Sequence, residues 1–224
     1  GMQAATINAA HQCQTPNIKR LQQRGVTFQR AHTSCPVCSP ARGSLMTGLL
    51  PHNHGVLEVE HGKDADQCVL REDKPHWAQR LVDAGYRTGY FGKWHIERSN
   101  ELERFGWQTH VVKGSEHHKH LGKGTHAFNA EELDPALCGY LEDPPGYNRI
   151  LHYGVTDVAP EERPSGVSVN CASEFLDERI GGEEPWCCAV SLSEPNEALV
   201  CGRSAFERYD VDAIELPKNL DADF

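Results

Sequence analysis

The spacing of hydrophobic and polar residues near the start of the chain predicts a helix, a strand and a further helix. Residues 15–25 (TPNIKRLQQRG) predict a short helix, because a capping threonine and a proline stand at its start and a glycine at its end. Residues 26–33 (VTFQRAHT) alternate and contain β-branched and aromatic side chains, which predicts a strand. Residues 40–47 predict the next helix, which Gly48 and Pro51 close.

A second helix and strand follow in the middle of the chain. Asp73 is expected to cap a helix over residues 74–85 (KPHWAQRLVDAG), in which the larger apolar side chains share one face. Residues 86–96 (YRTGYFGKWHI) predict a buried strand whose carboxyl end carries Lys93 and His95.

The rest of the pattern contains a long polar stretch, then a helix and a strand. Residues 108–165 are rich in glycine, histidine, proline and charge, so we expect a long excursion of loops there. Residues 165–182 (SGVSVNCASEFLDERIGG) predict a helix, and residues 185–193 (PWCCAVSLS) predict an apolar strand. Alternation of this kind indicates an α/β fold with a mainly parallel sheet flanked by helices.

A parallel sheet also predicts where a site should form. Sites in such sheets lie at the carboxyl ends of the strands. Cys38, Lys93 and residues 194–196 each follow a predicted strand. They lie far apart in the sequence, and the predicted sheet would bring them to one edge.

Composition excludes some classes of protein. The chain has 224 residues and a formal net charge of −10, and its 22 Lys and Arg side chains are scattered along it. It therefore lacks the basic stripe of a nucleic-acid-binding protein. No apolar run approaches the roughly 20 residues that span a bilayer, and residues 1–13 lack the basic start and apolar core of a secretory signal. We expect neither nucleic acid nor a membrane as a partner.

The nine cysteines bear on the cellular compartment. Their number is odd and their spacing irregular, and the chain is far larger than a disulfide-stapled mini-domain. Most are expected to be reduced and buried as small hydrophobic side chains. Reduced thiols favour a cytoplasmic location, and a periplasmic or secreted one would follow if a leader preceded this sequence.

The segment around Cys38 carries the most specific chemistry of the chain. Cys35 and Cys38 have the spacing of half a zinc site, but no second pair of this spacing completes four ligands. A redox pair and an ordinary buried thiol are the other simple interpretations. The continuation CSPARGSLMTG weakens all three, because Cys38 is followed by Pro40, Arg42 and a threonine–glycine turn.

This Cys-x-Pro-x-Arg pattern resembles the signature of the type I sulfatases, a formylglycine-dependent, arylsulfatase-like family of the alkaline-phosphatase-like superfamily. Residues 15–33, 48–56 (GLLPHNHGV) and 81–96 (LVDAGYRTGYFGKWHI) resemble further blocks of that family in the same order. The resemblance covers residues 15–57 and 76–96. It implies a sulfatase-like α/β fold and hydrolysis of a small-molecule sulfate monoester.

The resemblance also implies roles for particular residues. A separate maturation enzyme would oxidise Cys38 to formylglycine, whose hydrated aldehyde is the nucleophile and a ligand of a divalent cation, Ca²⁺ or Mg²⁺. Arg42 would hold the alkoxide or a sulfate oxygen, Lys93 would contact the sulfate, and His95 would bond the formylglycine diol. Asn196 is a further candidate for substrate binding, although the family has a histidine at this place. Residue 38 would also stand at a helix N-terminus, which favours an anion.

Two features depart from the family pattern. Paired aspartates that bind the cation should come just before the first residues of this chain, and further ligands and a lysine should follow Phe224. We therefore expect residues 1–224 to be an incomplete N-terminal portion of the catalytic domain, impaired because the other metal ligands are missing. An incomplete sheet would expose an edge that homo-oligomerisation can cover.

Several alternatives stay open on the sequence. Related enzymes with the formylglycine motif hydrolyse phosphonate or phosphate esters. A non-catalytic relic would keep only an anion-binding pocket, and a zinc-binding adaptor would use the cysteines. His52 and His54 are expected to stabilise a loop. A solvated loop is expected for the histidine-rich run of His117, His118, His120 and His126.

Overall fold

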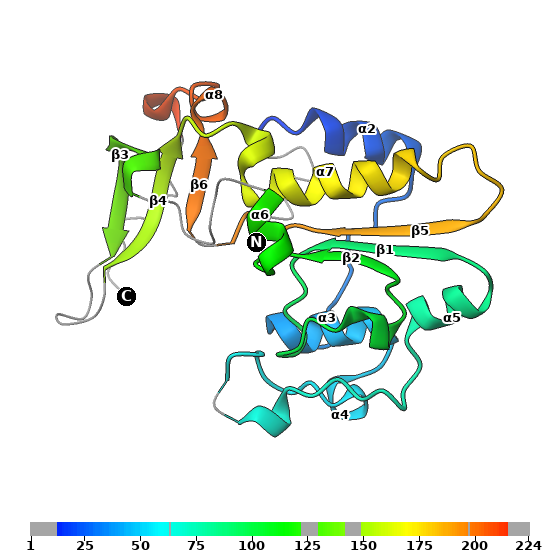
Figure 1. The fold of residues 1–224 in the computed structure, drawn as a ribbon. Helices are drawn as coiled ribbons and strands as arrows, with labels where there is room; N and C mark the ends of the chain where they lie inside the picture. Colours follow the sequence, from blue (N-terminus) through cyan, green and yellow to red (C-terminus); the bar gives the residue numbers. More distant parts are fainter. Residues whose placement is uncertain (1–12, 63, 122–129, 142–148, 197, 215–224) are drawn as a thin grey trace. The chain divides into compact units, whose positions relative to one another are not determined.

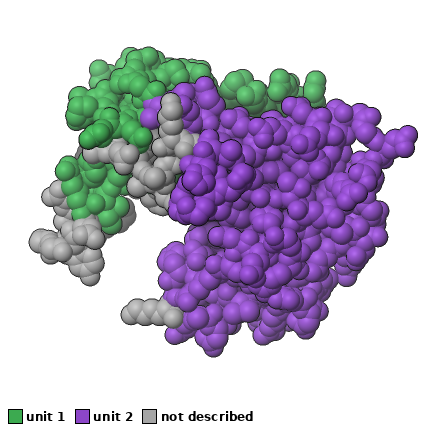
Figure 2. Space-filling model, in the orientation of Figure 1, with its two compact units in different colours: residues 1–31, 129–157, 194–224 green, residues 32–128, 158–193 purple. Residues whose placement is uncertain are grey.

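A computed structural model describes residues 13–62, 64–121, 130–141, 149–196 and 198–214. The chain separates into two compact units (Figure 2). Unit 1 contains residues 1–31, 129–157 and 194–224, and unit 2 contains residues 32–128 and 158–193. Within the described residues, no helix is both long and apolar enough to cross a bilayer.

Unit 2 is built on a three-stranded parallel sheet. Its order is β2 (Thr109–Val112), β1 (Arg87–Gly92) and β5 (Trp186–Ser191). In the register of the central strand, Gly92 lies opposite Val112 on one side and Ser191 on the other. The predicted mainly parallel α/β sheet is therefore confirmed, and the strands predicted near residues 86–96 and 185–193 are its centre and one edge.

Helices cover both faces of this sheet. α7 (Pro164–Asp177) runs along one face, and α3 (Cys38–Thr47) and α5 (Trp77–Asp83) lie on the other (Figure 1). Because successive side chains of a strand point to opposite faces, neighbouring residues of β1 enter different cores. Tyr90 packs into the cluster that contains Trp94 and Trp107, whereas Phe91 packs with Phe175 of α7.

Local sequence explains where α3 and α5 end, and it corrects one helix start. Gly48 ends α3 with φ +72°, a left-handed conformation that favours glycine. Gly85, with φ +85°, follows the end of α5 in the same way. The predicted cap at Asp73 is wrong: His76 is the N-cap residue, because the Asp73 side chain instead pairs with Lys74 at 2.5 Å in a turn.

The strand predicted over residues 26–33 is also wrong. The structure gives these residues no strand, and the side chains of Val26 and Phe28 are 82% and 81% exposed. Apolar alternation produces a strand only where a neighbouring strand supplies hydrogen-bond partners. None of the described strands pairs with this segment. The helix predicted just before it is confirmed as α2 (Pro16–Arg24), which belongs to unit 1.

Residues 108–165 contain regular elements in place of the expected loops. β2 belongs to unit 2, as does α6 (Glu116–Leu121). In unit 1, β3 (Leu133–Leu141) pairs antiparallel with β4 (Ile150–Thr156), and β4 pairs parallel with β6 (Leu199–Gly202). Glycine and proline are typical of loops, so these strands were not predicted. β3 accommodates Pro135 and Gly139 because its register with β4 is irregular.

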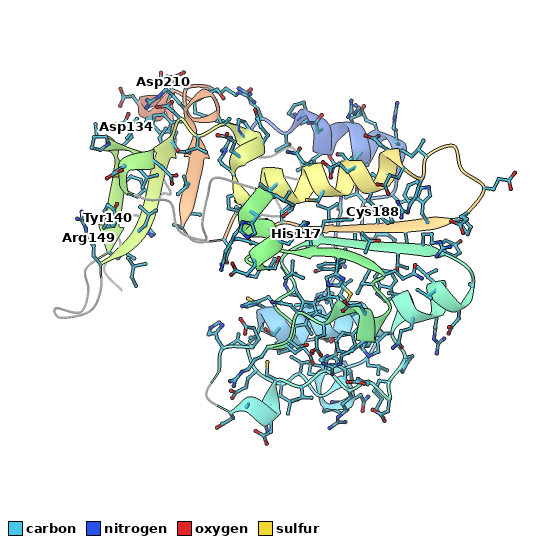
Figure 3. All side chains as sticks on the ribbon, viewed as in Figure 1. His117, Asp134, Tyr140, Arg149, Cys188 and Asp210 are labelled. Carbon is cyan, nitrogen blue, oxygen red and sulfur yellow. The ribbon has the colours of Figure 1, made fainter. Side chains whose placement is uncertain are left out.

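Charged side chains stabilise unit 1 around its sheet. Arg203 donates from Nε to Asp157 and from Nη2 to Asp134, each at 2.8 Å. Tyr140 and Arg149 lie together where β3 and β4 approach their connection (Figure 3), with the guanidinium 3.8 Å from the ring centroid. The remaining short helices are α4 (Pro51–His54), α8 (Arg203–Phe206), η1 (Ala65–Gln67), η2 (Leu102–Phe105), η3 (Ala130–Glu132), η4 (Pro160–Glu162) and η5 (Val211–Ala213).

Candidate active site

Cys38 is the first residue of α3, and its side chain is exposed. The helix therefore begins two residues before the predicted start at Pro40. Its first intrahelical bond runs from the Ala41 N–H to the Val37 carbonyl at 3.0 Å. The N–H groups before Ala41 have no partner inside the helix, so the thiol stands at an end that favours negative charge.

Arg42 connects this helix to the carboxyl edge of the sheet. Its Nη1 donates to the Lys93 carbonyl at 3.1 Å and to the Ser191 hydroxyl at 2.8 Å. Lys93 directly follows β1, and Ser191 ends β5. The structure thus gives Arg42 a positioning contact with two strand ends, and its contact with a sulfate oxygen remains a prediction.

The backbone of Lys93 is fixed from several sides. Its N–H donates to the Ser191 carbonyl at 2.7 Å, and its carbonyl accepts from the Tyr90 hydroxyl at 2.7 Å as well as from Arg42. Such a residue cannot shift without breaking these hydrogen bonds. The sequence reasoning therefore placed Lys93 correctly at a strand end, and the structure adds the contacts that hold it there.

His95 adopts an unusual backbone conformation close to these groups. Its φ of +53° lies in the left-handed region, which costs a residue with a side chain about 1 kcal/mol or more. Burial, together with the positive charges of Lys93 and Arg42, lowers the pKa of His95 to about 4. Its Nε2 lies 3.5 Å from Glu60 Oε1. Among the described residues, its buried Nδ1 has no hydrogen-bond partner.

Lys113 is a candidate that the sequence reasoning missed. It follows β2 at the same carboxyl edge, and its N–H donates to the Gly92 carbonyl at 2.8 Å. Its Nζ donates to the Ser193 hydroxyl at 2.7 Å. The signal for Lys113 was the pair of valines before it, which the expectation of loops from residue 108 concealed.

His54 is fully buried beneath α3. The Val56 N–H donates to its Nδ1 at 3.2 Å, so Nε2 carries the proton and donates to the Ser44 hydroxyl at 3.1 Å. Ser34 also donates to the Ser44 hydroxyl, at 2.7 Å. Gly43 leaves the space for the imidazole, because a Cβ there would lie 2.7 Å from its Cε1. His54 thus supports the helix that carries Cys38.

We expect the unfolding free energy to decrease as the pH falls below 6.5, the ordinary histidine pKa. Burial lowers the pKa of His54, so folding favours its neutral form. This contribution is present above the unfolded pKa and is lost as the pH falls toward the folded value, by at most about 1.4 kcal/mol per pH unit. Urea unfolding at a series of pH values measures it.

Two variants separate His54 from other titrating groups. His54→Gln should show a weaker pH dependence than the parent, whereas His117→Gln, at an exposed histidine of α6, should keep the parental dependence. Equal slopes for the parent and His54→Gln would contradict the assignment.

The other predicted residues have different surroundings. Asn196 is exposed and belongs to unit 1, whereas Cys38, Arg42, Lys93 and His95 all belong to unit 2. Convergence of residues 194–196 with the other candidates therefore remains a prediction.

All nine cysteines are free, as expected. Only Cys68 and Cys171 are buried, so the expectation that most are buried is wrong. Of the other seven thiols, one begins α3, four lie in strands and two lie outside regular elements: Cys38, then Cys138, Cys187, Cys188 and Cys201, then Cys13 and Cys35. The histidine-rich run is not a solvated loop either. It contains α6, and the buried His118 contacts the Pro164 carbonyl at 3.1 Å. His126 lies outside the described residues.

Near Cys38, the structure does not offer the ligands that Ca²⁺ or Mg²⁺ requires. Among the described residues, the potential ligand cluster of this region consists of Glu60, His61 and His95. Alkaline-earth cations prefer six or more oxygen ligands, or several waters held by carboxylates. The one carboxylate and two imidazoles of this cluster do not by themselves meet that requirement within the described part of the chain.

The parallel sheet and the exposed thiol define the class: an α/β protein that presents Cys38 at a helix N-terminus, on a helix whose Arg42 bonds the ends of β1 and β5. The profile of the family described as Sulfatase matches residues 2–132. The chain belongs to the sulfatase family.

Curated relatives agree with this assignment. The chain is 36% identical to the sulfatase YidJ of Escherichia coli over 197 residues, which are 87% of this chain and 36% of that protein. It is 26% identical to the choline-sulfatase of Rhizobium meliloti, over 87% of this chain and 36% of that protein. It is 25% identical to the arylsulfatase of Clostridium perfringens, over 97% of this chain and 45% of that protein. The chain thus spans between a third and a half of each relative.

Solved structures share the fold. The yidJ sulfatase of Bacteroides fragilis superposes with a TM-score of 0.61 at 22% identity, over 94% of this chain and 46% of that one. The structure of BT4656 with its substrate D-glucosamine-2-N,6-O-disulfate gives a TM-score of 0.54 at 19% identity, over 87% of this chain and 32% of that one. The expected sulfatase-like α/β fold is therefore confirmed.

Proposed function

We propose that the protein hydrolyses sulfate monoesters and that Cys38 is the precursor of its formylglycine nucleophile. The observation that carries this proposal is the position of Cys38. It is exposed at the first residue of α3, and Arg42 on the same helix bonds the backbone of Lys93. Membership of the sulfatase family and the Cys-x-Pro-x-Arg sequence support it.

Each residue has a defined task in this proposal. The N-terminus of α3 and the Lys93 ammonium attract the sulfate group. Arg42 keeps the helix against the strand ends, so the nucleophile and Lys93 hold a fixed separation. His95 lies within reach of the same charges and takes a proton as sulfate leaves. Asn196 is proposed as a further substrate ligand.

Formylglycine would supply the covalent chemistry: one hydroxyl of its hydrate would take the sulfuryl group as the S–O bond to the alcohol breaks and the alcohol leaves, the other would lose its proton and expel sulfate to restore the aldehyde, and water would rehydrate it. No step of this scheme is assigned to Ca²⁺ or Mg²⁺, because the described donors near Cys38 do not fit either ion. A partner is needed to make the aldehyde, so a maturation enzyme is part of the proposal.

We expect only weak hydrolysis by residues 1–224. The reason is the donor set near Cys38, which lacks the charge that makes a bound hydroxyl acidic. The measurement is turnover of p-nitrophenyl sulfate after co-expression with a formylglycine-generating enzyme. Robust calcium-dependent turnover would contradict the impairment while supporting the sulfatase activity.

A substrate panel distinguishes the remaining functions. The relatives include a choline-sulfatase and an arylsulfatase, so choline sulfate belongs beside the aryl ester. Faster hydrolysis of a phenylphosphonate ester than of any sulfate would overturn sulfate specificity. Formylglycine formation without turnover of any ester would favour a non-catalytic, anion-binding relic.

Self-association remains part of the proposal. β5 is an edge strand of its described sheet, and Trp186, Val190 and Leu192 on or after it are 40%, 45% and 43% exposed. An apolar edge is prone to pair with another chain. Light scattering tests this, and a monodisperse monomer would contradict it.

A further inference from the structure

Three ligating side chains cluster beside the first turn of α3. Glu60, His61 and His95 each bring one ligand atom to within 4.8 Å of the others. Glu60 Oε1 lies 3.5 Å from His95 Nε2 and 3.8 Å from His61 Nδ1. We propose that these side chains bind a zinc-class transition-metal ion next to Cys38.

The distances from Glu60 Oε1 to the two histidine nitrogens fit coordination of a shared ion better than direct hydrogen bonds between the side chains. Hydrogen bonds between nitrogen and oxygen are about 2.7–3.2 Å long, so both separations are too long for that contact. Zinc bound at about 2.0–2.2 Å by four tetrahedral ligands places neighbouring ligand atoms roughly 3.4 Å apart. The observed 3.5 and 3.8 Å therefore approach the edges of such a tetrahedron before any ion has drawn the side chains together.

The backbone around the cluster is already fixed. The Glu60 N–H donates to the hydroxyl of Ser39, the residue after Cys38, at 3.1 Å. Arg98 donates from Nε to the Glu60 carbonyl at 2.9 Å and from Nη2 to the Gly62 carbonyl. Both ends of the short turn that carries His61 are thus held in place. Ligands held in this way need little reorganisation to accept an ion.

The cluster is open on one side and closed on the other. The side chain of His61 is 68% exposed, whereas those of Glu60 and His95 are 28% and 17% exposed. An ion can therefore reach the cluster from solvent past His61. Its fourth coordination position would stay open to water. Two imidazoles and one carboxylate favour zinc, cobalt, nickel or copper over calcium and magnesium.

Charge makes Glu60 the decisive ligand. Lys93 and Arg42 act on His95 with positive charge, which opposes a further cation. The carboxylate of Glu60 offsets that repulsion, and an amide of the same shape cannot. Glu60→Gln is therefore the sharpest variant, because it keeps the size of the ligand and removes its charge.

An ion at this position would also inhibit hydrolysis. His95 cannot accept a proton while its Nε2 is coordinated, so zinc is expected to suppress the turnover proposed above. This consequence rests on the proposed function, whereas binding itself does not. Binding is therefore measured first, in a Cys35→Ala/Cys38→Ala background that is inactive and lacks the nearby thiols.

The experiment is a Co²⁺ titration of this background followed by visible absorption, with Zn²⁺ as competitor. We expect one tetrahedral site per chain, displaced by Zn²⁺ and not by a large excess of Ca²⁺. His61→Ala and Glu60→Gln should each weaken binding about 100-fold, because even groups outside the ligand shell change metal affinity by roughly 10- to 100-fold. The matched control, His117→Ala/His120→Ala, removes exposed histidines of α6 and should bind like the parent.

Several outcomes would overturn the proposal. They are equal binding by parent, His61→Ala and Glu60→Gln, displacement by Ca²⁺, loss of binding in the α6 control, and thiolate charge-transfer bands from a remaining cysteine. Circular dichroism of each variant excludes unfolding as the cause of weakened binding. Zinc binding by this background, together with no ester hydrolysis by the metal-free protein that carries formylglycine at position 38, would support the metal site and overturn the proposed function alone.

Discussion

Replacing Cys38 with alanine is expected to abolish formylglycine formation and to reduce any sulfate ester hydrolysis to background. The side chain supplies the carbon that becomes the aldehyde, so its replacement removes the proposed nucleophile. Loss of the nucleophile in a covalent mechanism costs at least about 1,000-fold in kcat. The effect should therefore exceed that of any positioning residue in the site.

Mass spectrometry and aldehyde labelling measure this result independently of turnover. After co-expression with the maturation enzyme, the peptide that contains Cys38 should be lighter by about 18 Da and should react with a hydrazide probe. Cys35→Ala is the matched control: it removes a thiol three positions upstream, outside α3, and should leave conversion intact. Conversion that persists in Cys38→Ala, or disappears in Cys35→Ala, would contradict the assignment of the nucleophile.

The parts of the site that follow from sequence are those with strong local signals. α3 was predictable because Pro40 suits its first turn and Gly48 follows its end, and β1 because threonine and aromatic residues come soon after Gly85 and lead to Lys93. In a parallel sheet the end of such a strand lies at the functional edge whatever its neighbours are. Lys93 could therefore be placed at a strand end from sequence alone.

The parts that could not be predicted depend on contacts between distant segments. Glu60 lies in a turn whose sequence shows no regular hydrophobic pattern. Its contacts with Ser39 and His95 join segments that are distant in the sequence, so they could not be predicted before the fold was known. Residues 26–33 show the opposite error: their alternation is typical of a strand, but a strand also needs a partner. Lys113 was missed because the glycines and histidines around it outweighed the signal of only two valines.

Gly92→Ala is expected to destabilise the protein by about 3–5 kcal/mol and to lower Tm by roughly 10 °C. Gly92 has a φ of +108°, which favours glycine, and an added Cβ would lie 2.1 Å from the Ser191 carbonyl oxygen. That oxygen already accepts the Lys93 N–H at 2.7 Å. Relief of the clash therefore has to separate the ends of β1 and β5, which are paired at this position.

Gly85→Ala separates the cost of the clash from that of the backbone conformation. Gly85 has a similar φ of +85°, but an added Cβ would meet no atom within 4 Å. We expect this variant to lose only about 1–2 kcal/mol, the usual cost of a left-handed residue with a side chain. Thermal unfolding of both variants measures the difference, and equal losses would show that the approach to Ser191 carries no cost. The Lys93 N–H donates a hydrogen bond to this same carbonyl. A larger loss in Gly92→Ala would therefore show that the strand pairing which stabilises the sheet also positions the proposed sulfate ligand.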